Sequence, residues 1–172
     1  MSWVLCGLLL AASPARAAQT RRPTMSDADA KFQKGLYQEA LGDYEALAKS
    51  ARGEEQVKAQ FRACEAEALL FRYGEAIGRF EKIVLPKKGP DRARLLLLKA
   101  ELYREYLKQY GFGLRGDVVE GEGSAFRKTP KELRREAEAA YRELWDMRAE
   151  LARMPIAGES YFLDVAKADR SL

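Results

Sequence analysis

One segment of this chain recurs after 36 residues, and this repeat is the strongest constraint on the fold. The eleven residues that begin at Tyr37 (YQEALGDYEAL) align with the eleven that begin at Tyr73 (YGEAIGRFEKI), with five identities and three conservative exchanges. In both copies an aromatic residue, an alanine, a second aromatic residue and an aliphatic residue follow one another at intervals of three or four. Side chains at these intervals lie on one face of an α-helix. A helical unit repeated at this length is typical of a stack of helical hairpins.

The rest of the chain carries further helix signals. An apolar stripe over residues 57–71 indicates the first helix of the second unit, and Pro90 suits the first turn of a long apolar helix. The sequence Thr-Pro-Lys-Glu at 129–132 is a capping-box signature, and Ser26 is the expected N-cap of the first helix. The fold class is therefore expected to be all-α. The predicted helices span residues 26–34, 36–51, 57–71, 74–84, 90–110, 130–154 and 161–169.

The two aligned segments resemble the second helix of a tetratricopeptide repeat, and the resemblance covers roughly residues 26–110. The usual period of that family is about 34 residues, so the interval of 36 indicates a variant repeat. The resemblance implies a short solenoid of two to three antiparallel helical hairpins with an inserted glycine-rich loop. A degenerate third copy is expected at Ala137, Tyr141 and Leu144, where Arg134 replaces the first aromatic residue.

The N-terminus has the pattern of a secretory signal peptide. An uncharged apolar run, Trp3 to Ala12, precedes the sequence Ala15-Arg16-Ala17, where a signal peptidase would cut. The product is therefore expected to be exported, to a periplasm or to the extracellular space. If translation instead begins at Met25, the product would be cytoplasmic. The expected organisation is a signal peptide at 1–17, a flexible mature N-terminus at 18–25 and a helical repeat domain at 26–172.

The composition argues against several classes of protein. The chain has no His, so it lacks the base of Ser-His-Asp and Cys-His catalysis and the imidazole ligand of common zinc and haem sites. The 30 basic and 26 acidic residues are interspersed, which provides no positive stripe for nucleic acid and no polybasic patch for a membrane. No apolar run approaches the roughly 20 residues of a transmembrane helix. We expect no cofactor, no metal and no enzymatic activity.

Two further features carry competing interpretations. Cys64 lies on the apolar stripe of its helix, which favours burial over a reactive thiol. Residues 111–128 contain five glycines and are predicted to form an irregular loop. The acidic residues of this loop do not follow the ligand order of a calcium-binding loop. The loop is interpreted as either a mobile linker or a surface that contacts a partner.

Polar residues on the first helix of each hairpin are candidates for partner binding, because tetratricopeptide arrays bind peptides in the groove that these helices line. Ordinary solvent exposure explains the same residues equally well. Members of the family that clamp a peptide carboxylate use Asn, which this chain lacks. The resemblance implies a non-catalytic module whose partner is another protein or a peptide, and the signal-peptide pattern implies that this module is exported. The candidate residues are Lys58, Arg62, Glu65, Arg94, Glu101 and Arg104.

A second resemblance offers an alternative. The run Tyr110-Gly111-Phe112-Gly113 after a long helix, and the later Tyr161-Phe162-Leu163, are similar to the N-terminal region of large bacterial alpha-2-macroglobulin-like proteins. The chain would then be a structural spacer at the front of a larger envelope protein. The remaining alternative is an enzyme that relies on carboxylates or Lys, although no pair of these residues is spaced for acid–base work.

Overall fold

The computed structural model describes residues 22–110 and 128–163, and this part of the chain is all-α, as the sequence predicts. No strand occurs within these residues. The predicted signal peptide, 1–17, lies outside them, as do residues 111–127 of the predicted loop. The helices are α1 (Met25–Gln33), α2 (Tyr37–Ser50), α3 (Gly53–Leu69), α4 (Tyr73–Phe80), α5 (Pro90–Tyr110), α6 (Pro130–Asp146), α7 (Arg148–Leu151) and the short 3₁₀ helix η2 (Ile156–Glu159).

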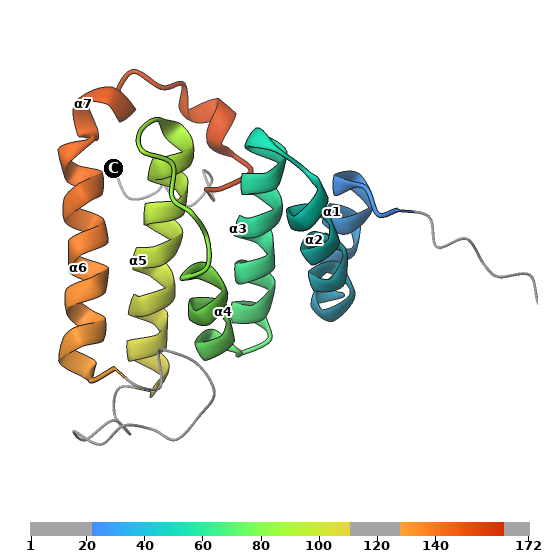
Figure 1. Cartoon of the computed structure of the whole chain (residues 1–172), viewed down its shortest axis with the longest axis horizontal. Coiled ribbons are helices and arrows are strands. Elements are labelled where there is room, and N and C mark those ends of the chain that lie inside the picture. The colour runs from blue at the N-terminus through green and yellow to red at the C-terminus, as the bar shows by residue number, and fades with distance from the viewer. Residues whose placement is uncertain (1–21, 111–127, 164–172) are drawn as a thin grey trace, which may run out of the picture.

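The helices form three hairpins that stand side by side (Figure 1). Helix α1 packs on α2, α3 packs on α4, and α5 packs on α6, while α2 and α4 each contact the first helix of the next hairpin. The long helices α3 and α5 also touch each other. After α7 the chain turns back past the N-terminal end of α5 and reaches α3 (Figure 1). This return brings the last described residues to the helices on which the sequence places the candidate binding residues.

The turns between the helices repeat at the interval seen in the sequence. Gly35 after α1 and Phe71 after α3 have positive φ angles of 77° and 60°. Gly53 and Gly89, at the start of α3 and directly before α5, have φ angles of 60° and 88°. The members of each pair are 36 residues apart. The left-handed conformation therefore recurs at both ends of the second helix in two successive hairpins, and glycine adopts it without steric cost.

The repeated motif supplies buried residues to successive layers of the core. Ala40 and Tyr44 are buried in a cluster shared by α1, α2 and α3. Their counterparts Ala76 and Phe80 belong to a larger cluster that α5 and α6 complete. Cys64 is fully buried in this larger cluster, as its position on the apolar stripe predicts. Burial raises the pKa of its thiol, which makes the side chain unreactive.

One of the two predicted helix caps is confirmed and the other is wrong. At α6 the Thr129 hydroxyl accepts a hydrogen bond from the amide of Glu132, and the Glu132 carboxylate accepts one from the amide of Thr129 at 2.8 Å. At α1 the cap is Thr24 instead of Ser26, because the Thr24 hydroxyl accepts the 3.2 Å bond from the amide of Asp27. The helix therefore begins at residue 25, inside the segment predicted to be flexible. Both Thr and Ser suit an N-cap, so residue type alone did not separate the two positions.

Three helical segments are shorter than predicted. Helix α4 ends at Phe80 rather than near residue 84, and the chain then runs to Pro86, whose predecessor is biased away from helical backbone. Helix α6 ends at Asp146, and the separate α7 replaces a continuous helix to residue 154. Residues 161–163 form a turn instead of a helix, because contacts with α1, α3 and α5 hold Tyr161 and Phe162. The remainder of that predicted helix, 164–169, lies outside the described residues.

Candidate functional site

The candidate site lies where the last described residues cross the first helices of the three hairpins. We call residues 155–163 the C-terminal strap, and we call the surface formed by α1, α3 and α5 the first-helix face. The strap leaves α7, forms η2 and then places residues 161–163 against this face. Its polar contacts reach Asp29 of α1, Arg62 of α3 and Arg94 of α5. The strap therefore touches all three hairpins.

Tyr161 links the strap to α1 and α3. Its hydroxyl donates a hydrogen bond of 2.8 Å to Oδ1 of Asp29, which also accepts a 2.7 Å bond from the hydroxyl of Tyr44. The ring centroid of Tyr161 lies 4.4 Å from Cζ of Arg62 and 5.3 Å from Nζ of Lys58. Burial and the bond to Asp29 raise the pKa of Tyr161. The phenol is therefore neutral near pH 7 and acts as a hydrogen-bond donor.

Arg62 connects α1, α3 and the strap. Its guanidinium group lies between two aromatic rings, 4.8 Å from the centroid of Phe32 and 4.4 Å from that of Tyr161. It donates hydrogen bonds to Glu65 at 2.6 Å and to the main-chain carbonyl of Tyr161 at 2.7 Å. Every residue has such a carbonyl, so this second bond would hold a peptide backbone whatever its side chains.

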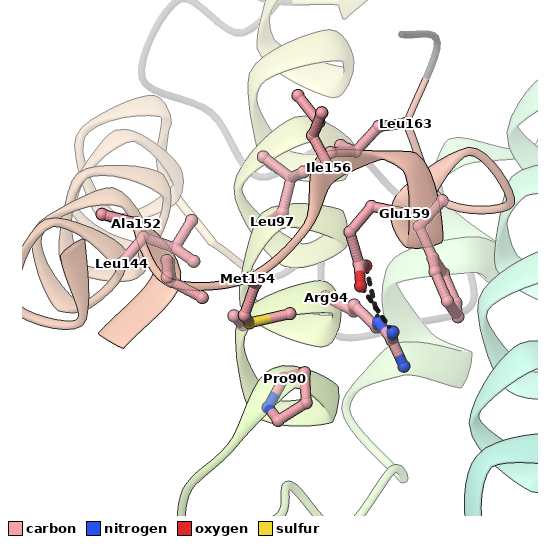
Figure 2. A pocket seen from close by; sticks show the side chains of 12 residues that line it. Pro90, Arg94, Leu97, Leu144, Ala152, Met154, Ile156, Glu159 and Leu163 are labelled. Atoms are coloured by element: carbon pink, nitrogen blue, oxygen red, sulfur yellow. Dashed lines mark hydrogen bonds and ion pairs between the residues drawn. The ribbon is translucent and has the colours of Figure 1, made fainter. Parts of the chain in front are cut away.

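Arg94 and Glu159 form a forked ion pair between α5 and the strap (Figure 2). The Nε and Nη2 groups of Arg94 donate to the two carboxylate oxygens at 2.8 and 2.7 Å. Only 12% and 13% of the two side-chain surfaces are exposed. Arg94 also donates to Asp91 at 2.8 Å, and its Cζ lies 4.4 Å from the ring centroid of Phe162. The hydrogen bonds from Arg94 lower the pKa of Glu159, and a forked pair of this kind is selective in geometry as well as charge.

Phe162 packs between α3 and α5, where its ring meets that of Phe61 edge to face at a centroid distance of 5.1 Å. Two largely apolar cavities, of about 390 and 480 Å³, lie on either side of it. Leu97, Phe162 and Leu163 line both cavities. The smaller cavity, drawn in Figure 2, lies between α5, the region of α7 and the strap. The larger one lies between α3 and α5. The end of the strap thus separates two parts of one apolar trough.

Comparison with known proteins identifies no relative of this chain. No family model matches the chain, and neither a curated protein nor a solved structure matches it. Among the described residues, no group of three or more Cys, Asp or Glu side chains is placed to hold a metal ion. In the same part of the chain, no helix has both the length and the apolar character needed to span a bilayer. The function is therefore inferred from the contacts of the strap.

The structure brings together part of the predicted binding set. Glu65 accepts a hydrogen bond from Arg62, so it lies one contact away from the strap. Glu101 and Arg104 lie further along α5, where they pair with each other and Glu101 accepts a 2.6 Å bond from the hydroxyl of Tyr141. Glu101 also lines the larger cavity, beside Phe162 and Leu163, whereas the side chain of Arg104 is exposed. The predicted residues that contact the strap are Lys58, Arg62 and Arg94.

The sequence does not predict the other half of the site. Asp29 and Phe32 of α1 and three strap residues, Glu159, Tyr161 and Phe162, were not among the candidates. One signal was available, because Gly158, shortly before the aromatic pair, is typical of a turn and disfavours a continuous helix. An aromatic pair in a turn would be exposed to solvent unless it packed against a distant element, so the pair indicates such packing.

Proposed function

We propose that this protein is a non-catalytic interaction module of the tetratricopeptide type, which binds a segment of another protein on its first-helix face. The sequence repeat, the hairpin stack and the 36-residue recurrence of the turn conformation support the type of module. The apolar run and the Ala15-Arg16-Ala17 sequence support export.

The strap is the observation that carries this proposal. The first-helix face holds a stretch of polypeptide through a bond to its main chain, a forked ion pair and an inserted aromatic ring. Main-chain hydrogen bonds contribute affinity for any peptide, whereas pockets and ion pairs select particular side chains. The face combines both kinds of contact, which is the chemistry of peptide recognition.

The cavities beside the strap support the binding of a second segment. Their volumes, about 390 and 480 Å³, lie within the range of ligand sites, and their walls are mostly Leu, Ala, Phe and Met side chains. Apolar surface that is already concave and preformed binds apolar side chains with little loss of conformational entropy. The face therefore offers unfilled binding surface as well as the surface that the strap covers.

Panning of a displayed library of random peptides tests the proposal. The full chain is used as wild type and as Glu159→Lys, in which a strap lysine would face Arg94. We expect the selected peptides to bind at least about tenfold more weakly when Leu97→Lys adds a charge where the two cavities meet. Val84→Lys is the matched control, because Val84 is 90% exposed outside the face. Peptides that bind the Leu97→Lys chain as tightly as the chain with Leu97 would contradict the proposal.

Export is tested independently. N-terminal sequencing of the mature protein from the natural host is expected to begin at Ala18, directly after the predicted cleavage site. A cytoplasmic product that begins at Met25 would contradict export and would leave the peptide-binding proposal intact.

A further inference from the structure

We infer that the C-terminal strap occupies the peptide site of its own chain and that a partner displaces it. The partner segment carries the residue pattern of the strap, which is acidic, any residue, aromatic, aromatic, aliphatic. The pattern is that of Glu-Ser-Tyr-Phe-Leu at residues 159–163. The inference rests on the proposed function, to which it adds the sequence class of the partner and a mechanism of regulation.

The burial of the strap divides its residues into anchors and spacers. Glu159, Tyr161 and Leu163 are half-buried and Phe162 is buried, and each contacts the first-helix face. Gly158 and Ser160 are exposed. The anchors alone therefore define the pattern that a competing segment has to reproduce.

Each anchor satisfies a group on the face that would otherwise be left poorly paired. Without Glu159, the largely buried Arg94 keeps Asp91 at 2.8 Å and the more exposed Glu54 at 3.8 Å, and an incompletely paired buried charge is unfavourable. Without the strap, Phe61 loses its edge-to-face partner and the trough is opened to water. A free face therefore favours a segment that presents a carboxylate and an aromatic ring at the same separation.

The length of the trough explains how an external segment can displace an attached one. The residues of α5 that line the two cavities run from Pro90 to Glu105, which is about 22 Å at the rise of an α-helix. An extended segment of about seven residues covers this distance. Four strap residues, Ile156, Glu159, Phe162 and Leu163, line the cavities but leave them open, so a longer partner gains apolar contacts that the strap lacks. This gain opposes the high effective concentration of a tethered competitor.

Binding of the strap sequence in trans tests the inference. The probe is a labelled peptide of residues 154–163 (MPIAGESYFL) with blocked termini, and fluorescence anisotropy measures its affinity for the full chain. We expect the Glu159→Lys chain to bind the probe at least about tenfold more tightly than wild type, because the apparent affinity scales with the fraction of open sites. Glu150→Lys is the matched control, since Glu150 is exposed on α7, and it should bind as wild type does.

An exchange of charge identifies the contact. The Glu159→Lys chain should prefer the natural probe over one in which Lys replaces Glu159. The Arg94→Glu chain, whose strap is also repelled, should prefer the lysine probe. Both comparisons use two probes on the same chain, so partial unfolding of a variant cannot create the reversal. A preference that does not reverse, or equal affinity of the natural probe for all folded chains, would overturn the inference.

The library experiment separates the failure of this inference from that of the proposed function. Peptides that depend on Leu97 but lack the acidic–aromatic pattern would overturn the inference and support the function. If the probe does not bind the opened chain and no library peptide depends on Leu97, both are overturned.

Discussion

At the scale of single residues, Phe71 marks a difference between two otherwise similar repeats. It has a φ angle of 60° and a side chain that is 67% exposed, whereas Gly35 holds the equivalent position with a φ angle of 77°. A residue with a Cβ atom pays roughly 1 kcal/mol or more for this conformation. The exposed ring recovers little of that energy by burial. The strain is therefore a local cost that the second repeat carries and the first does not.

Exchange of this residue isolates the strain. We expect Phe71→Gly to raise the free energy of unfolding by about 1 kcal/mol relative to Phe71→Ala, because alanine removes the ring but keeps Cβ. Gly35→Ala should lower it by a similar amount. Urea denaturation followed by circular dichroism measures both differences. A Phe71→Gly chain no more stable than Phe71→Ala would show that the backbone is not strained there.

Cys64 provides a second test at this scale, since it is fully buried and its pKa is raised by burial. We expect a thiol reagent to modify Cys64 only as fast as the protein unfolds, and within the mixing time in denaturant. Peptide mapping by mass spectrometry distinguishes it from Cys6. As a control, Ala46→Cys, which is exposed on α2, should react at once. Fast labelling of native Cys64 would refute its burial.

At the scale of elements, one arginine connects the second helix of two hairpins and the helix between them. Arg79 of α4 donates to Glu67 of α3 at 2.9 and 2.6 Å, and it also donates to Glu45 of α2. The Glu67 side chain is only 7% exposed, whereas that of Glu45 is 38% exposed. The two halves of this group should therefore differ in their effect on stability.

Removal of the cation leaves Glu67 buried without its partner. We expect Arg79→Ala to lower the free energy of unfolding by about 3 kcal/mol, and Glu45→Ala, which removes only the exposed partner, by less than about 1 kcal/mol. Replacement of both Arg79 and Glu67 by Leu should recover much of the loss. Denaturant unfolding of the four chains measures these values. Equal losses of unfolding free energy in Arg79→Ala and Glu45→Ala would contradict the expected effect of burial.

The elements that the sequence predicts best are those whose signals are local. The capping box of α6 is confirmed because Thr129 and Glu132 interact within one turn. The stripe through Phe61 and Cys64 predicts α3 because helical periodicity is a property of the segment itself. The turn at residues 161–163 is predicted wrongly as a helix, since distant side chains determine its conformation.

At the scale of the whole molecule, the strap makes stability depend on pH. Arg94, and more weakly Lys58, hold the pKa of Glu159 below its usual range. Because the folded pKa is lower than the unfolded value of about 4.3, the stabilisation is complete well above that value and is lost as the pH falls through the folded pKa. We expect wild type to be more stable than Glu159→Gln by about 2 kcal/mol near neutral pH.

Urea denaturation of the two chains over a range of pH measures this linkage. The difference between them should shrink below about pH 4 and disappear once Glu159 is protonated in the folded state. A difference that stays constant over the whole range would mean that the charge of Glu159 does not hold the strap.

Half of the site cannot be predicted from the sequence, because its position depends on how the whole chain folds. Arg62 and Arg94 lie on first helices, so helical periodicity is enough to place them on the binding face. Glu159 is 65 positions from Arg94, and no pattern in either segment specifies that they meet. The pairing follows from the return of the chain after α7, which depends on the packed hairpins.

The hydrogen bond between Asp29 and Tyr161 spans 132 positions and joins the first hairpin to the end of the described chain. In an open stack of repeats each unit interacts with its neighbours alone, so the terminal units fray independently. The strap adds an interaction between units that are not neighbours, which couples the fraying of α1 to the far end of the stack and makes unfolding more cooperative. Release of the strap would remove this coupling. Amide hydrogens of α1 should then exchange faster with solvent in the Glu159→Lys chain without a partner than in wild type, although the substitution lies beside α5.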